Sequence, residues 1–244
     1  MMNRSIFLSL CLCLWGCNDP NAPDFFKSTG KTSQENRPIS SPFSKLFIED
    51  NIDLVLRNDS LPIFELRGGK NLLPKISLRI ENGVATISNQ NTVNWLRSFK
   101  PKLEVSVPGL WLNFLYVNGF GEVNSQDTLH LKNFIISHYG QADATIKLSL
   151  DTLHTDVNGQ GNLYLIGKAK YAYSTIQKFA KQDASQFETE AHDLRTYGNR
   201  NIFVNPRRRM VAIVEGSGNV FYKRNLEELL VYGSGSGRVL KDLE

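Results

Sequence analysis

A seven-residue pattern occurs six times in the second half of the chain, and it constrains the fold more than any other feature. The third position is glycine in every copy, and the fifth is glycine in four of them. The third-position glycines, Gly119, Gly140, Gly159, Gly198, Gly216 and Gly233, are therefore 21, 19, 39, 18 and 17 residues apart. The copies are Val117–Val123, His138–Ala144, Val157–Leu163, Thr196–Ile202, Val214–Val220 and Val231–Gly237.

The spacing predicts a solenoid, because a fixed period of about 20 residues is typical of stacked repeats. The interval of 39 residues corresponds to two periods, and a degenerate copy, Ser174–Ala180, fits the middle of it. Short runs that alternate apolar and polar residues fill each period, as in Leu129–Gly140. Coils of equal length built from such strands favour a parallel β-helix, here of about six or seven coils over residues 112–244.

Positions one, three, five and seven of the pattern face the same side of a strand, and the first and seventh are mostly apolar. The apolar residues at positions one and seven are therefore expected inside the β-helix, on the same face as the glycines at positions three and five. Two explanations for the glycines stay open: opposing walls approach too closely for a Cβ, or the chain bulges with a positive φ. In the degenerate copy and the fourth copy, Ile176, Lys178 and Arg200 occupy glycine positions, which predicts irregular coils there.

Two outward positions of the pattern supply candidate site residues. Stacking aligns the sixth position into a polar ladder, for which we weigh a structural role against a binding strip for a cation or a sugar. The second position carries tyrosines, which offer flat apolar surface and a hydroxyl group to a ligand or simply stabilise stacked strands. The ladder is Glu122, Asp143, Asn162, Asn201, Asn219 and Ser236, and the candidate binding face is Tyr139, Tyr197 and Tyr232.

The section before the repeats, residues 43–111, predicts further strands with one buried face. Ile52–Leu56, Ile76–Ile80 and Leu103–Val107 each alternate apolar with polar residues. Asn82–Gly83 favours a tight hairpin. No segment carries a convincing apolar helical stripe, so the sequence predicts an all-β chain with a short N-terminal β section.

The N-terminus resembles an export signal over residues 1–16. Arg4 precedes the apolar run Ile6–Trp15, which is too short to span a bilayer. The run ends in Leu14-Trp15-Gly16-Cys17, which is similar to a bacterial lipobox, although Trp15 departs from it. We expect Cys17 to carry a lipid and residues 17–42, rich in Asn, Pro and Ser, to form a flexible tether.

Composition excludes several function classes. All three cysteines lie at or before Cys17, so a mature chain has no disulfide, thiol nucleophile or Cys-based metal site. The net charge of +4 is weak and Arg207–Arg209 is the only dense basic cluster, so we predict no nucleic-acid partner. That cluster is interpreted as a solvated turn, with acidic envelope polymers as possible partners. No cofactor is predicted.

The repeats, the phrase Gly69–Ile76 followed by Glu81-Asn82-Gly83, and the ending Gly233–Gly237 resemble the putative auto-transporter adhesin head domain, or GIN domain. The resemblance covers residues 43–243. It implies a right-handed parallel β-helix with an N-terminal β section, commonly on exported lipoproteins of Gram-negative bacteria. It implies no catalytic residues.

Signals for catalysis are weak in this sequence. The four histidines, His130, His138, His154 and His192, have no metal-binding spacing and are interpreted as surface or edge residues. No helix follows the Gly-rich runs, which excludes a phosphate loop. A carbohydrate-active enzyme would need acids grouped in one groove, and nothing in the repeats marks such a set.

The sequence therefore predicts a non-enzymatic, lipid-anchored outer-membrane protein that faces the periplasm or the cell surface. It would bind a glycan or an envelope protein through a rigid β face. The alternative is a periplasmic structural or assembly scaffold, whose distinguishing feature would be an open terminal coil. The oligomeric state is not predicted.

Overall fold

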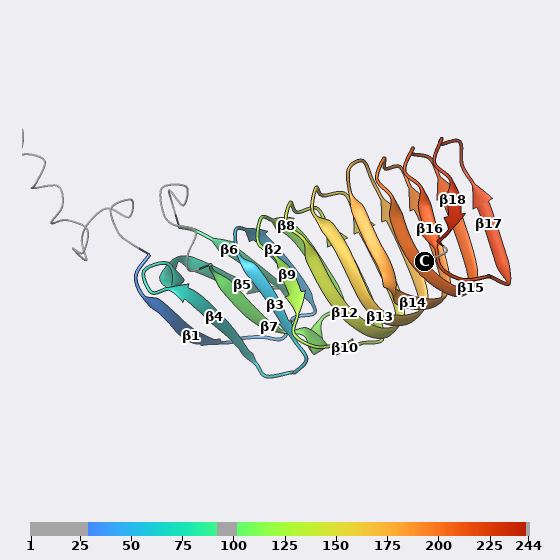
Figure 1. The fold of residues 1–244 in the computed structure, drawn as a ribbon. Helices are drawn as coiled ribbons and strands as arrows, with labels where there is room; N and C mark the ends of the chain where they lie inside the picture. Colours follow the sequence, from blue (N-terminus) through green and yellow to red (C-terminus); the bar gives the residue numbers. More distant parts are fainter. Residues whose placement is uncertain (1–28, 92–101, 243–244) are drawn as a thin grey trace, which may run out of the picture.

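The computed structural model describes residues 29–91 and 102–242, and these fold into a β-solenoid of about seven turns (Figure 1). The expected all-β parallel helix is confirmed, and no α-helix occurs among these residues. The strands are β1 Thr32–Pro38, β2 Lys45–Asp50, β3 Asp53–Arg57, β4 Ile63–Gly69, β5 Ile76–Glu81, β6 Val84–Asn89, β7 Glu104–Pro108, β8 Phe114–Gly119, β9 Val123–Ser125, β10 Leu129–His130, β11 Asn133–His138, β12 Ala144–Val157, β13 Asn162–Ile176, β14 Lys181–Thr196, β15 Ile202–Val214, β16 Val220–Tyr222, β17 Glu228–Tyr232 and β18 Val239–Lys241. Short 3-10 helices cover Leu73–Lys75 and Gly109–Trp111.

Each coil of the solenoid has two strand runs that pair in parallel with the coils on either side. We call the outer surface of β2, β8, β11 and the second halves of β12 to β15 the front face, and that of β3, β9 and their first halves the rear face. The 13-residue register between β12 and β13, from Ala144↔Leu163 to Val157↔Ile176, shows how regular the stacking is. The seven-residue pattern forms the corner that joins a front run to the next rear run, and we call this corner the glycine edge.

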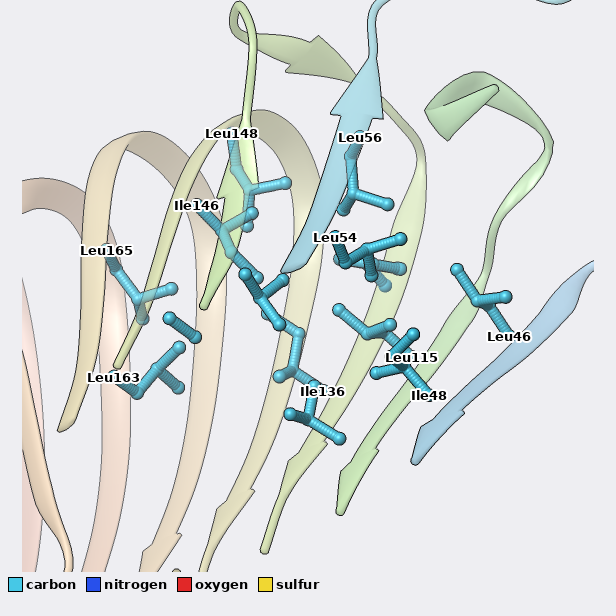
Figure 2. Close-up of a cluster of buried hydrophobic side chains, with 14 of the residues drawn as sticks. Leu46, Ile48, Leu54, Leu56, Leu115, Ile136, Ile146, Leu148, Leu163 and Leu165 are labelled. Carbon is cyan, nitrogen blue, oxygen red and sulfur yellow. The ribbon is translucent and has the colours of Figure 1, made fainter. Parts of the chain in front are cut away.

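The core fills the space between the two faces of the solenoid (Figure 2). Strands bury every second residue, as in β12, where Ile146, Leu148 and Leu153 are at most 1% exposed. This alternation is the one predicted from the sequence, and it removes the apolar side chains from water, the dominant stabilising term in folding.

The glycines are required because adjacent coils approach too closely at the glycine edge. A Cβ added to Gly121, Gly161 or Gly216 would lie 1.9, 2.0 or 2.0 Å from a backbone carbonyl oxygen of the neighbouring coil. The first explanation is wrong about the partner, because the close contact is with the backbone of the adjacent coil and not with the opposing wall. The second explanation, a positive φ, applies at one position. Among the motif glycines only Gly233 has a positive φ, of 114°.

The predicted N-terminal β section is continuous with the solenoid, as expected for one domain over residues 43–244. β2 lies in parallel between β6 and β8, and β3 lies in parallel between β7 and β9. The parallel stacking therefore begins within the expected section, and no structural break occurs at residue 112. The solenoid is closed at this end by antiparallel pairs, β5 with β6 and β4 with both β1 and β7.

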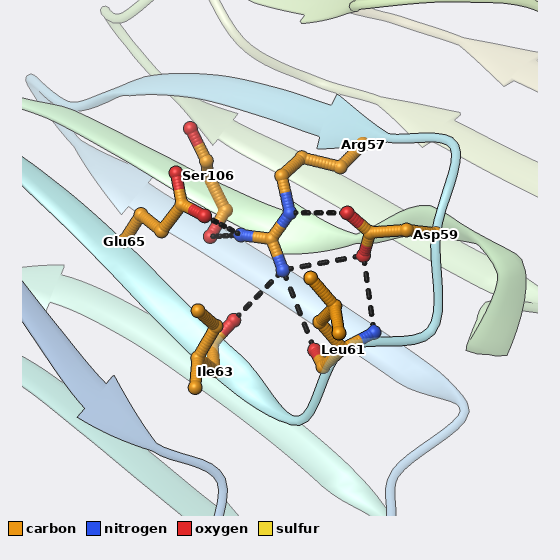
Figure 3. Close-up of polar contacts among 6 residues, drawn as sticks. All are labelled: Arg57, Asp59, Leu61, Ile63, Glu65 and Ser106. Carbon is orange, nitrogen blue, oxygen red and sulfur yellow. Dashed lines mark hydrogen bonds and ion pairs between the residues drawn. The ribbon is translucent and has the colours of Figure 1, made fainter.

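A buried arginine holds this N-terminal cap together (Figure 3). Arg57 is 5% exposed, donates to Asp59 Oδ2 at 3.0 Å, and lies 3.4 Å from Glu65 Oε1. It also donates to the carbonyls of Ile63 and Ser106. The two carboxylates and the carbonyls balance the buried charge, so Arg57 ties β3 to β4 and β7.

The tether predicted for residues 17–42 does not extend to residue 42. Residues Thr32–Pro38 form β1, which pairs antiparallel with β4 along its whole length. Arg37 fixes this strand by donating to the carbonyls of Leu73 and Ile76 at 2.7 and 2.6 Å. The sequence carries no signal for this strand, because β1 buries no residue fully and so lacks the alternation of apolar and polar residues. The export signal and Cys17 lie outside the described residues.

Four polar side chains form a network inside the solenoid. The Thr155 hydroxyl lies 2.7 Å from Gln182 Oε1 and 2.9 Å from Ser174 Oγ, which lies 2.9 Å from His192 Nε2. All four side chains are buried. Burial lowers the pKa of His192 to about 4. The prediction of surface or edge histidines is therefore wrong for His192, and also for His138, which is fully buried.

Replacing Gly216 by alanine is predicted to destabilise the fold by roughly 2 kcal/mol or more, because the new Cβ would clash with the Gly198 carbonyl. Gly198→Ala is the matched control at the same pattern position. Its Cβ would lie 3.0 Å from the Lys178 carbonyl, so its cost should stay below about 1 kcal/mol. Urea unfolding measures both variants, and equal losses would contradict the close-contact explanation.

Acid is predicted to weaken the fold through His192. Because its folded-state pKa of about 4 lies below the ordinary value of 6.5, protonation favours the unfolded chain. Stability should be fully present above pH 6.5 and fall as the pH drops toward 4, by roughly 3 kcal/mol from this group. Urea unfolding across this range should show a shallower pH dependence for His192→Gln than for the wild type. The same slope in both proteins would show that this histidine does not contribute.

Candidate functional site

The strand register fixes which residues share a position at the glycine edge. It shifts the bounds of two of the seven copies relative to those predicted from the sequence. In the last coil, Gly235 lies against Gly216, Gly237 against Gly218, and Val239 pairs with Val220. The last copy is therefore Gly233–Val239 and not Val231–Gly237. The degenerate copy is Ile176–Gln182, because Ile176 pairs with Val157 and Gln182 with Leu163.

This shift corrects the predicted site residues. Arg238, not Ser236, occupies the sixth position of the last copy, and its amide donates to Asn219 Oδ1 at 2.9 Å. Tyr232 is not in the second position either, because it pairs with Ile213 of the front face. Ile176 is an inward first-position residue. Lys178 does occupy a glycine position, and its φ of 49° shows how a bulkier residue is accommodated there.

The polar ladder holds adjacent coils together. Asp143 Oδ1 accepts hydrogen bonds from the backbone amide of Asn162 at 2.9 Å and from its side-chain amide at 2.8 Å. Asn201 Oδ1 accepts from the backbone amide of Asn219 in the same way, at 3.2 Å. Asp53, which the pattern search missed, plays this role for the amide of Glu122 at 2.9 Å. The geometry therefore gives the ladder a structural role, satisfying corner amides.

The predicted tyrosines do not form one face. Tyr139 and Tyr197 share the second position, but Asn158 and Gln177 lie between them in the stack. Tyr139 donates its hydroxyl to Asp156 Oδ2 at 2.6 Å, and this hydrogen bond is the main reason that the pKa of Tyr139 rises to about 12. Tyr197 and Tyr232 are 48% and 56% exposed and lie in later coils.

A continuous group of aromatic side chains does cover the first coils of the front face. The ring of Phe47 lies 5.8 Å from that of Phe114 and 5.1 Å from that of Tyr116, and Tyr116 lies 5.6 Å from Tyr139. The group continues along the solenoid, because Ile135 pairs with both Phe114 and His154, and His154 stacks on Tyr173 at 4.7 Å. We call this set of residues the front-face strip: Phe47, Phe114, Tyr116, Ile135, Tyr139, His154 and Tyr173.

The strip is accessible to a ligand. Ile135 and Tyr173 are each 41% exposed. The rings of Phe47, Phe114 and Tyr116 are half-buried. Sequence reasoning found only Tyr139, because it searched within the seven-residue pattern. The other members lie in the strand that precedes each copy. Applying the coil period to outward positions of those strands would have found them.

The basic cluster Arg207–Arg209 is neutralised by acidic residues from neighbouring coils. Arg207 lies 3.1 Å from Glu188, Arg208 lies 3.0 Å from Glu227, and Arg209 lies 2.9 Å from Asp193. No group of three His, Cys, Asp or Glu side chains suited to a metal ion occurs within residues 29–91 and 102–242. Nor does the part of the chain that the structure describes contain a helix able to span a membrane.

Residues 42–225 match the family model described as "Putative auto-transporter adhesin, head GIN domain". No curated protein matches the chain. Solved structures with the same fold include a putative adhesin from Bacteroides fragilis, with a TM-score of 0.78 and 18% identity over 87% of this chain and 97% of that one. A putative adhesin from Parabacteroides merdae gives a TM-score of 0.64 at 19% identity, covering 87% and 98% of the two chains. A putative lipid binding protein from Parabacteroides distasonis gives 0.61 at 16% identity, covering 86% and 98%.

Proposed function

This chain belongs to the family of the putative auto-transporter adhesin head GIN domain, and on that premise we propose that it is a non-enzymatic cell-envelope protein that binds a glycan or another protein through its front face. The observation that carries the proposal is the front-face strip. It places aromatic rings from successive coils beside one another on a rigid sheet, where a ligand can lie flat across them.

The chemistry of the strip suits a sugar ring. A pyranose has one face of C–H groups and a rim of hydroxyl groups, so it needs an apolar plane with polar groups at the border. Phe47, Phe114 and Tyr116 supply a continuous apolar surface, in which the rings are tilted against one another by 45° and 39°. Asp156 lies beside it, holding the Tyr139 hydroxyl at 2.6 Å, and fixes a polar border. Aromatic side chains of this kind are also enriched at protein interfaces, so an envelope protein is the other ligand class.

The proposal includes export and lipid anchoring. The Leu14-Trp15-Gly16-Cys17 sequence supports lipidation of Cys17, and residues 18–31 would then link the lipid to β1. The protein would be an outer-membrane lipoprotein that faces the periplasm or the cell surface. Two carboxylates of the front face have structural partners, because Asp156 binds Tyr139 and Asp193 binds Arg209.

The test compares two aromatic pairs on opposite faces. Phe114→Ala/Tyr116→Ala removes the centre of the strip, and Phe203→Ala/Phe221→Ala removes a stacked pair, 5.2 Å apart, from the rear face. On a glycan array, followed by calorimetry with the best ligand and with extracted envelope proteins, the front pair should lose roughly tenfold or more in affinity. The rear pair should bind like the wild type, with thermal unfolding as the check that both variants fold.

Binding that depends on the rear pair, or a wild-type protein that binds neither ligand class, would overturn the proposal.

The alternative function, a periplasmic scaffold, is favoured by one observation. Within the described residues, β17 and β18 of the last coil pair only with β15 and β16, and Val231 is 51% exposed although its partner Ala212 is fully buried. Concentration-dependent association in sedimentation velocity, without ligand binding, would favour that scaffold.

A further inference from the structure

A groove follows the corner opposite the glycine edge, where each rear run turns into the next front run. It encloses about 740 Å³ and crosses successive coils. Its residues recur at the coil period, three from each of four coils and one from the next: His130, Leu131, Lys132, Ser149, Leu150, Asp151, Lys168, Ala169, Lys170, Glu188, Thr189, Glu190 and Arg207. Because the groove crosses successive coils, it runs along the solenoid axis. Adjacent coils are about 4.8 Å apart along this axis.

The groove has an uncharged floor and two polar walls. The floor residues Leu150, Ala169 and Thr189 pair in register and are each at least 91% buried. On the rear side, Ser149 pairs with Lys168 and Lys168 with Glu188. On the front side, the amide of Asp151 donates to the carbonyl of Lys132. A linear ligand along the axis would therefore meet polar groups on both sides at every coil.

The charges leave two lysines available for a ligand. All three acids are engaged: Asp151 lies 2.8 Å from Lys170, while Glu188 and Glu190 lie 3.1 and 4.0 Å from Arg207. Lys132 and Lys168 are exposed, and neither ammonium group has a hydrogen bond or ion pair with any residue in the described ranges. Lys132 has only a weaker Coulombic interaction with Asp151, whose main partner is Lys170. The lining contains four lysine and arginine side chains and three acidic side chains, so the net charge of the groove is positive.

The floor residue Thr189 is 1% exposed, so the contacts that the groove offers to a ligand come from its walls and rims. At the front rim, Tyr171 follows Lys170 directly and is 50% exposed, which offers an aromatic face beside the charges.

We propose that this groove binds a linear acidic oligosaccharide, with Lys132 and Lys168 contacting its carboxylate or sulfate groups and Tyr171 contacting a sugar ring. The two lysines are two coils apart, roughly 10 Å along the axis, which suits charges repeated along an extended polymer. The hydroxyl groups of the sugar would meet Ser149 on the rear wall of the groove. This site is distinct from the front-face strip and does not rest on the function proposed for that strip.

The test uses a galacturonate hexasaccharide, its methyl ester and a sulfated chondroitin hexasaccharide, measured by calorimetry on the full mature chain. Lys132→Gln/Lys168→Gln should weaken binding of the acidic sugars roughly tenfold, whereas Lys31→Gln/Lys70→Gln, the same charge change in the N-terminal cap, should not. The methyl ester should bind weakly to every protein. Both acidic sugars carry carboxylates, so equal binding would indicate a carboxylate ligand, and tighter binding of the chondroitin would indicate that sulfate contributes.

Three outcomes would overturn the proposal. The wild type would bind neither acidic sugar, or the cap variant would lose as much affinity as the groove variant, which would mean attraction by overall charge. A hexaglutamate peptide that binds as tightly as the sugars would assign the groove to acidic protein segments. Phe114→Ala/Tyr116→Ala should leave binding in the groove unchanged, so failure of this proposal and failure of the front-face proposal can be told apart.

Discussion

The contact on which the structure depends is between the backbones of adjacent coils at the glycine edge. Built onto Gly159 or Gly218, a Cβ would lie 2.1 Å from a carbonyl oxygen of the coil before it. Only glycine allows this approach, so each glycine pair fixes where one corner lies on the next. The side-chain oxygens of Asp143 and Asn219 then hold the following corner amides, and the strands between the corners inherit this register.

Because register is inherited, outward residues with the same spacing become neighbours on the surface. Phe47 and Tyr116 come from distant parts of the sequence, yet stacking brings their rings to 5.1 Å. The same rule places Asp151 of one coil 2.8 Å from Lys170 of the next. A solenoid thus builds extended, repetitive surfaces from short local patterns, which suits the recognition of long or flat ligands.

The sequence predicts the architecture well because the glycine pattern reports a local constraint that applies to most of the coils. The sequence does not predict features that depend on long-range strand pairing. Gly233 and Gly235 both fit the third position by sequence, and only the pairing of Val239 with Val220 decides between them. β1 lacks an apolar pattern, and its place depends on β4, more than 20 residues later. The parallel insertion of β2 between β6 and β8 is likewise a long-range pairing with no local signal.

Amide hydrogen exchange, resolved by residue, tests most directly whether the corners set the register. The corner amides of Asn162, Asn219 and Arg238 bond to side-chain oxygens of the preceding coil. We predict that they exchange as slowly as amides inside β12 and β13, because they open only when coils separate. Exchange as fast as that of Gly83, at the tip of the β5–β6 hairpin, would show that the corners are loose and would contradict the account.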